Sequence, residues 1–382
     1  MRYTTAGESN GTSLVAVVTG VPAGLRLHED AINADIARWA HCHGKRELPA
    51  DGIHIITGVN AGRTTGAPVT LFLDNSAYLA SPANAHLNRA GGCTSPRPGT
   101  AELAGCLNTD ADDCSAIAGR DSLRADVMRV AAAAVAREFL ADFGVDVQSY
   151  VTRIGEAAMR EEARALEGFI YAPLDIETSS VRCPSAQATR SMEAALDRAV
   201  EDGDTLGGEF ALIATGVMPG LGGYAEPEDN MAMQLTSAVF RARGVTGVQV
   251  GCAERASRMR GFDATDAISL TAAQGFSRET NLAGGVEAGM TTGKPVVLRA
   301  LVAPSTSFGI SVPTMDMATL QPVLARPRAY EPCLVPAAAV AAEAEVSFAL
   351  ANAYLRKFGE GAMADIHAAA AAYERRLKMA AR

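Results

Sequence analysis

The sequence predicts an α+β protein in which helices pack against antiparallel sheets. Short apolar runs rich in Val, Ile and Leu are mixed with long alanine-rich segments, without the strict alternation of strand and helix that a doubly wound parallel sheet requires. The chain has 382 residues, of which 48% are hydrophobic, and this is enough to bury a large core. Because no segment has the composition of a linker, we expect a single domain over residues 1–382, with a C-terminal helix at about 362–382.

The first third of the chain contains three expected strands and one helix. Residues 13–21 (SLVAVVTGV) are a β-branched apolar run next to glycine, and this is typical of a buried strand. Residues 53–59 and 67–75 have the same character and are joined by the tight loop NAGRTTG. Residues 28–44 have early acidic residues and an amphipathic pattern, which predict a helix.

The remaining elements follow from the same two patterns. Helices are expected over about 120–143, 191–203, where Gly203 ends the helix, 337–359 and the C-terminal segment. Strands are expected over 145–156, 210–219, 245–251 and 295–304. Residues 184–190 and 251–266 have little periodicity, so loops are expected there.

Charge and cysteine content exclude several functional classes. A net charge of −9 and a pI near 5.3 argue against a nucleic acid or an acidic membrane as partner and favour a small anionic ligand in a local basic pocket. The seven cysteines are scattered without the paired spacing of zinc sites, so no metal site is expected and the thiols should be reduced. With no signal sequence and no run long enough to cross a bilayer, we expect a cytoplasmic protein.

Two neighbouring segments predict an anion site. In PRPGTAEL, two prolines restrict the backbone around Arg97 and hold its side chain in one direction. In RDSLRADV, Arg120, Ser122 and Arg124 stand at the start of the helix over about 120–143, where free N–H groups and the helix dipole favour negative charge. The alternative is an ordinary surface helix start with solvated arginines.

These segments, and most of the chain, resemble the chorismate synthase family. That family shows Pro-Arg-Pro-Gly-His-Ala-Asp and then Arg-x-Ser-x-Arg-Glu-Thr before an alanine-rich helix. The other motifs follow in the same order along the chain: AGESNG, GVPAGL, GRTTGAP, EDGDTLGG, GVMPGLGG, GVTGVQVG, TNLAGGVEAGMTTG and YEPCLVPAAAV. The glycine-rich segment TNLAGGVEAGMTTG does not open a helix after a strand in the frame of a dinucleotide site, so a Rossmann unit is not predicted.

The resemblance implies a fold, an assembly and a reaction. The fold would be the family's β-α-β sandwich with helices between antiparallel sheets, assembled as a homotetramer. The activity would be that of a carbon–oxygen lyase, which removes phosphate from 5-enolpyruvylshikimate 3-phosphate by 1,4-elimination to give chorismate. This reaction belongs to the shikimate pathway and requires reduced FMN without net redox change.

The resemblance also implies the site residues. The substrate-binding positions are Arg38, Lys45 in place of an arginine, Arg97, Arg124, and Arg328, which stands one residue before the family arginine at Ala329. The cofactor-binding positions are Arg120, Asp121, Ser122, Arg243, Gly244, Ala288 in place of a glycine, Ala303 in place of a lysine, Pro304 and Thr306. The catalytic positions are Asn10 and Thr100, where the family has histidines, and Glu331, where it has an aspartate.

Three hypotheses follow from these substitutions. The first is a divergent chorismate synthase, because the whole chain resembles the family and the arginines are retained. The second is a homologue that acts on another anionic small molecule, because histidine, lysine and arginine positions have changed together. The third is a non-catalytic subunit that keeps the fold.

Overall fold

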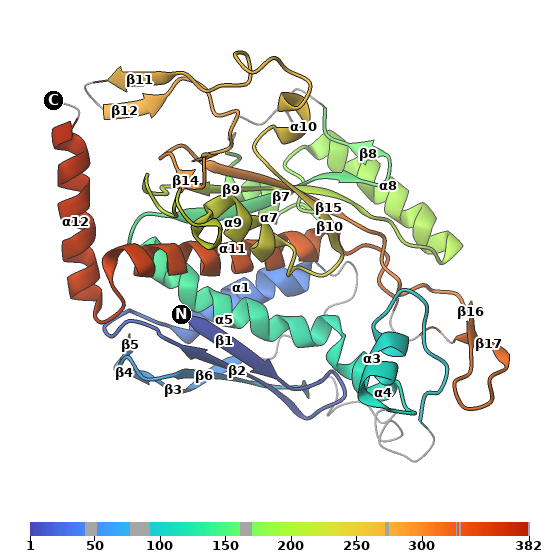
Figure 1. The fold of residues 1–382 in the computed structure, drawn as a ribbon. Coiled ribbons are helices and arrows are strands. Elements are labelled where there is room, and N and C mark those ends of the chain that lie inside the picture. The colour runs from blue at the N-terminus through green and yellow to red at the C-terminus, as the bar shows by residue number, and fades with distance from the viewer. Residues whose placement is uncertain are drawn as a thin grey trace.

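Two antiparallel sheets enclose a layer of helices (Figure 1). The computed structural model of the protein describes residues 1–42, 52–76, 92–160, 170–271, 275–325, 327 and 330–380. The first sheet consists, in spatial order, of β1 (Arg2–Ala6), β2 (Ser13–Thr19), β6 (Val69–Asp74) and β3 (Ile53–Thr57). The second consists of β10 (Val245–Val250), β15 (Val296–Val302), β9 (Gly208–Thr215), β7 (Asp146–Ile154) and β8 (Ala157–Ala158).

The helices divide into a central layer and a periphery. Helices α1 (Glu29–His41), α5 (Leu123–Ala141) and α11 (Val335–Phe358) lie between the sheets in Figure 1. The other helices are α3 (Glu102–Thr109), α4 (Ser115–Arg120), α7 (Pro173–Glu177), α8 (Ala186–Asp202), the 3₁₀ turn η2 (Pro227–Asp229), α9 (Met231–Val239), α10 (Ala253–Ala256) and α12 (Met363–Ala380). The described residues also form four two-stranded hairpins: β4 (Val59–Asn60) with β5 (Arg63–Thr64), β11 (Ile268–Thr271) with β12 (Gly275–Arg278), β13 (Val286–Glu287) with β14 (Met290–Thr291), and β16 (Val312–Met315) with β17 (Pro322–Ala325).

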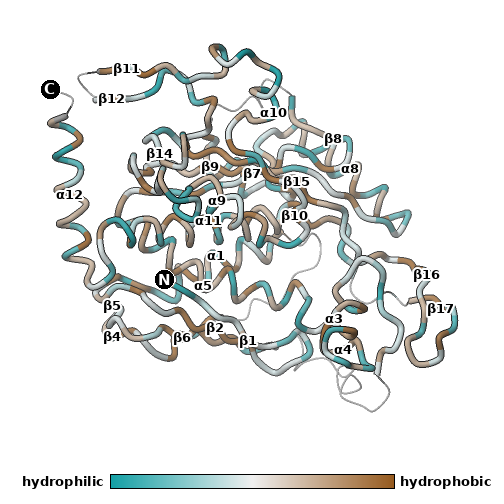
Figure 2. The backbone as a smooth tube through the Cα atoms, viewed as in Figure 1, coloured by the Kyte–Doolittle hydropathy of each residue, from teal (hydrophilic) through white to brown (hydrophobic). Residues whose placement is uncertain are grey.

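The sheets differ in how their faces are covered. On β2, Leu14, Ala16 and Val18 are buried and the alternating residues are more exposed, because only one face of this sheet packs on the helices. Strand β9 is buried over Gly208–Ala214, because it is central in the second sheet. Figure 2 shows that the strands of both main sheets are rich in hydrophobic residues.

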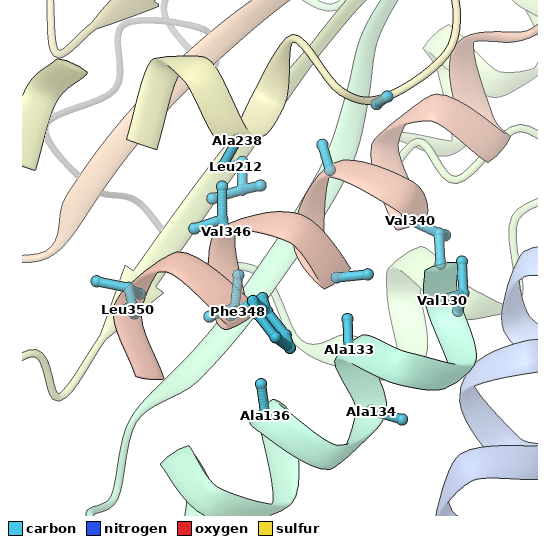
Figure 3. Close-up of a cluster of buried hydrophobic side chains, with 14 of the residues drawn as sticks. Val130, Ala133, Ala134, Ala136, Leu212, Ala238, Val340, Val346, Phe348 and Leu350 are labelled. Atoms are coloured by element: carbon cyan, nitrogen blue, oxygen red, sulfur yellow. The ribbon is translucent and has the colours of Figure 1, made fainter. Parts of the chain in front are cut away.

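Helices α5 and α11 form the core between the sheets. Both are buried on nearly every side, which suits helices that have a sheet on each side. Small alanines such as Ala133 and Ala136 on α5 let Phe348 of α11 pack closely, while Val346 lies near Leu212 of β9 (Figure 3). The alanine-rich composition therefore serves close packing between two layers.

A buried carboxylate connects the three central helices to the second sheet. The Glu343 side chain on α11 is completely buried and forms ion pairs with Arg38 of α1 at 2.8 Å, Arg137 of α5 at 3.0 Å and Arg182 at 3.1 Å. It also accepts hydrogen bonds from the backbone N and the Oγ of Ser149 on β7, at 2.7 and 2.6 Å. Burial alone would raise the pKa of Glu343, but the three arginines outweigh burial and lower it to about 2.

The predicted elements are confirmed with a few differences. Strand β1 has no apolar run and was not predicted; it joins the sheet through its antiparallel pairing with β2. The loop expected over residues 184–190 is wrong, because Ser185 caps α8 by accepting a hydrogen bond from Ala188 N, so the helix starts at Ala186. The loop expected over residues 251–266 is interrupted by the short helix α10. All seven cysteines are free, as expected, and five of them are buried. Within the described ranges, no helix is long and apolar enough to cross a membrane.

We expect Glu343→Gln to lower the free energy of unfolding by roughly 3–5 kcal/mol, because the change leaves buried guanidinium groups without their carboxylate. The matched control is Glu201→Gln, at an exposed position on α8, which should change it by less than about 0.5 kcal/mol. Urea unfolding of the full chain measures both changes. If the two variants had equal free energies of unfolding, the ion network would not make the proposed contribution to stability.

Candidate active site

The first part of the candidate site is the start of α5 together with the AGESNG loop. Ser122 caps α5: its Oγ accepts from Ala125 N at 3.3 Å and donates to Gly119 O at 2.9 Å. Ser9 N donates to Gly119 O at 2.9 Å, so the AGESNG loop lies against this helix start. The expected position of Ser122 and Arg124 at a helix start is thus confirmed, whereas Arg120, expected at the same start, is the last residue of α4. The contacting loop lies near the N-terminus of the chain.

Arg120 is exposed and bound only by uncharged oxygens within the described ranges. Its Nη1 donates to Gly7 O at 3.0 Å, and its Nη2 donates to Thr5 O at 3.0 Å and Thr5 Oγ1 at 2.7 Å. These contacts fix the guanidinium group in place. Because they do not neutralise it, its positive charge is available to an anion.

Arg124 lies in the first turn of α5, four residues after Arg120, which ends α4. Its Nε donates to Asn75 Oδ1 at 3.1 Å and its Nη2 to Asp74 O at 3.5 Å. The side chain is half-buried. Arg120 and Arg124 are therefore both oriented by polypeptide from the first sheet, at the ends of β1 and β6.

The Pro-Arg-Pro-Gly corner is held by a buried ion pair. Glu102, whose side chain is completely buried, accepts from Arg97 N at 2.7 Å and from Arg97 Nε at 2.8 Å, and it pairs with Arg97 Nη2 at 2.7 Å. Thr100 Oγ1 donates to Arg97 O at 2.9 Å and closes the corner. The direction of Arg97 is therefore set by Glu102 as well as by the prolines, and its charge is compensated.

A second set of ion pairs connects this corner to α5. Asp121 Oδ2 accepts from Ala101 N at 3.2 Å, while Asp121 Oδ1 pairs with Arg243 Nη1. Arg243 Nε also contacts Asp126 at 2.8 Å, and its Nη2 donates to Ser122 O at 3.3 Å. Burial alone would raise the pKa of Asp121, but the hydrogen bond and charge of Arg243 lower it.

The segments before β10 and after β15 complete the group. Ala303 N donates to Gly244 O at 2.8 Å, and Gly244 has a φ of +80°. Gly99 approaches Thr306 so closely that a Cβ added to it would lie 2.5 Å from Thr306 Cγ2.

Glu331 joins the same group through its backbone. Glu331 N donates to Ser307 O at 3.2 Å, and the residue is only 7% exposed. Pro304 is exposed on the same segment as Thr306. We refer to the connected residues 5–11, 97–102, 119–126, 243–244, 303–307 and 331–333 as the motif cluster.

Asn10 and Thr100 are the catalytic positions at which the family has histidine. Asn10 packs against α4, since a Cβ added to Gly119 would lie 2.4 Å from Asn10 Oδ1. Both residues belong to the motif cluster and are half-buried. Of the six histidines, four lie in the part of the chain that the structure describes, at positions outside this cluster: His28, His41, His54 and His367.

Some predicted site residues are placed elsewhere. Arg38 lies in the ion network of Glu343, where it also pairs with Glu177 at 2.9 Å. Ala288 is exposed in the β13–β14 turn with a φ of +46°, a conformation that favours glycine. Lys45 and Arg328 lie outside the described residues.

Residues that the sequence reasoning missed hold the site together. Glu102 and Asp126 are the carboxylates that pair with Arg97 and Arg243. Asn75 follows the apolar run of β6 and looks like an ordinary strand end in the sequence. Of these residues, only Glu102 could have been predicted from the sequence, because it stands five residues after Arg97 in the same motif. The described ranges contain no group of His, Cys, Asp and Glu suited to a metal ion.

Comparisons with known proteins agree with the resemblance seen in the motifs. The family model for chorismate synthase matches residues 1–355. Chorismate synthase from Rubrobacter xylanophilus is 39% identical over 388 aligned residues, which cover 100% of this chain and 98% of that protein. Chorismate synthase from Brevibacillus brevis is 36% identical, with 96% of each chain covered. A solved structure, "Crystal Structure of Chorismate Synthase", superimposes with a TM-score of 0.81 at 28% identity and covers 99% of this chain and 98% of that one.

We expect Gly99→Ala to cost more stability than Gly144→Ala. Both glycines have positive φ, +79° and +70°, so both substitutions should cost about 1 kcal/mol in backbone strain. Only at Gly99 would the new methyl group also collide with Thr306, since Gly144 has open space around its Cβ position. For Gly99→Ala, we therefore expect the free energy of unfolding measured with urea to fall by roughly 1–3 kcal/mol more than for Gly144→Ala. Equal losses would show that the corner and the 303–307 segment do not pack as described.

Proposed function

Because the chain belongs to the chorismate synthase family, we propose that it converts 5-enolpyruvylshikimate 3-phosphate to chorismate by 1,4-elimination, with reduced FMN as cofactor. The observation that carries this proposal is the motif cluster. Segments that stand far apart in the sequence, and that carry the family's motifs, are joined there by direct hydrogen bonds and ion pairs. We also propose the homotetramer and the cytoplasmic location that the family resemblance implies.

The arginines in the motif cluster would bind the anionic groups of the substrate. Loss of phosphate is accelerated by cations fixed where negative charge develops. Arg120 suits this role because its partners are uncharged, and Arg124 is oriented by an amide and a backbone carbonyl. Arg97 and Arg243 are compensated by carboxylates, so their proposed contribution is to hold the pocket's backbone in position.

The residues present fit the cofactor that the family uses. Gly244 is joined to Ala303 by a hydrogen bond and Gly99 packs on Thr306, so these small residues would lie against a flat ring, and Arg120 would supply positive charge. Reduced FMN, when bound, supplies electron density to the substrate as the carbon–oxygen bond breaks. This chain lacks the family lysine at Ala303, so we expect its affinity for FMN to be lower than that of relatives with the lysine.

The positions at which the family has proton-transferring residues are those at which this chain differs most from the family pattern. Asn10 and Thr100 form hydrogen bonds but deliver no proton at neutral pH. Each lost general acid costs roughly 10²–10⁴ in rate. We propose that Glu331, the carboxyl group of the motif cluster at the family's aspartate position, retains the role of base. Slow turnover is the expected result.

A second candidate is a diverged homologue that binds a different anion, with or without catalysis. The specific observation in its favour is the pairing of Arg243 with both Asp121 and Asp126, which compensates the charge at two of the predicted cofactor-binding positions, Arg243 and Asp121. A non-catalytic subunit would share this feature.

The decisive experiment is turnover under anaerobic conditions. Purified protein with reduced FMN and 5-enolpyruvylshikimate 3-phosphate should form chorismate slowly, and the absorbance of chorismate measures it. A chorismate synthase with both family histidines is the positive control. If the protein forms no chorismate while the control is active, the second candidate replaces the first.

Restoring the histidines should accelerate the reaction. We expect Asn10→His combined with Thr100→His to raise kcat at least about 10²-fold, because two groups able to transfer protons near neutral pH return to the family positions. The control is Asn10→Gln with Thr100→Asn, which adds bulk without an ionisable group. If the two double variants bind both ligands and turn over equally slowly, proton supply does not limit the rate.

A further inference from the structure

The side chain of Asn75 is buried between two parts of the motif cluster. Asn75 follows β6, is 0% exposed and forms four hydrogen bonds. Its backbone N donates to Thr12 O at 3.0 Å, and its Nδ2 donates to Ser9 O at 3.0 Å and Gly11 O at 2.7 Å. Its Oδ1 accepts from Arg124 Nε at 3.1 Å. Both hydrogens of the amide and its oxygen are therefore used.

The two carbonyl oxygens that accept hydrogen bonds from Asn75 Nδ2 lie on either side of residue 10 in the chain. Ser9 and Gly11 flank Asn10, the residue at the family's histidine position. One amide group thus holds the peptide carbonyls on either side of residue 10. This arrangement fixes the backbone from which the residue 10 side chain projects.

The oxygen of the same amide orients Arg124. Since an amide is neutral, it directs the guanidinium group without cancelling its charge. Aspartate has nearly the same shape, but it would place a carboxylate against Nε and would turn an acceptor oxygen toward the carbonyls of Ser9 and Gly11. The site therefore requires asparagine at this position for a reason of chemistry as well as of packing.

We propose that Asn75 is a positioning residue that fixes residue 10 and Arg124 relative to each other, an inference that rests on the proposed function. It acts on substrate only through these two neighbours. Substitution should therefore affect substrate binding through Arg124, and it should loosen the AGESNG loop even in the absence of ligand.

The first test is hydrogen exchange of the ligand-free full chain. Asn75→Ala should accelerate exchange in peptides covering residues 6–12 and 122–126. The matched control is Asn281→Ala: Asn281 is 5% exposed and its amide also joins two backbone groups, Pro295 O and Gly285 N, outside the motif cluster. Unchanged exchange at 6–12 and 122–126 in Asn75→Ala would overturn the proposal. If Asn75→Ala does not fold, Asn75→Asp takes its place in the same comparison.

The second test is calorimetric binding of 5-enolpyruvylshikimate 3-phosphate. Asn75→Ala and Arg124→Ala should each weaken binding by roughly 10- to 100-fold, the range expected for a hydrogen bond to a charged group. The double variant should be no more than about 3-fold weaker than Arg124→Ala, because Asn75 acts through Arg124. Asn281→Ala should bind like the unaltered protein.

The outcomes separate this inference from the proposed function. If the losses of the two single variants multiply in the double variant, or if Asn75→Ala binds as tightly as Asn281→Ala, the positioning role is wrong. If the unaltered protein does not bind this substrate, the proposed function fails, and hydrogen exchange alone decides the positioning role.

Discussion

The Glu343 carboxylate and its three arginines connect the layers of this protein. An unpaired charge in the interior would cost several kcal/mol, so each of these groups requires the others. The arginines come from α1, α5 and the segment before α8, and the carboxylate also binds Ser149 of β7. Arg182 adopts a positive φ of +57° to reach it, a strained backbone conformation for a residue with a side chain. The network thereby sets how α5 and α11 lie against the second sheet. The position of α5 matters for the candidate site because the other segments of the motif cluster contact the start of this helix.

The candidate site depends on that placement of α5. Its segments come from loops at strand and helix ends, and they are held by backbone hydrogen bonds and short ion pairs between loops. Glycines allow the closest approaches, at Gly99 beside Thr306 and at Gly119 beside Asn10. Such a site tolerates changes of individual side chains, because the backbone contacts remain when a histidine or a lysine is replaced. This accounts for a family fold and an intact framework around Asn10, Thr100 and Ala303.

The arginines of the motif cluster fall into two electrostatic classes. Arg97 and Arg243 pair with carboxylates and act as structural links, whereas Arg120 is bound by uncharged oxygens and keeps its charge for a ligand. Residue type alone does not distinguish these classes, since all are arginines beside a helix start. The distinction matters for function, because an uncompensated cation stabilises the negative charge of a departing phosphate more strongly than a cation already paired with a carboxylate.

The sequence by itself determined the family, the α+β class, most strands of the two main sheets, the long helices, and a helix start near Ser122. These features depend on local patterns: alternation along strands, alanine-rich helices, and motifs whose residues are neighbours in the chain. It did not reveal β1, which needs its partner β2, or the start of α8, where a cap replaced an expected loop. Nor did it show that Arg38 pairs with Glu343, or that Asn75 lies between residue 10 and Arg124. Those contacts join residues tens to hundreds of positions apart, and only the packing of two sheets around the helices decided which charges and amides would meet.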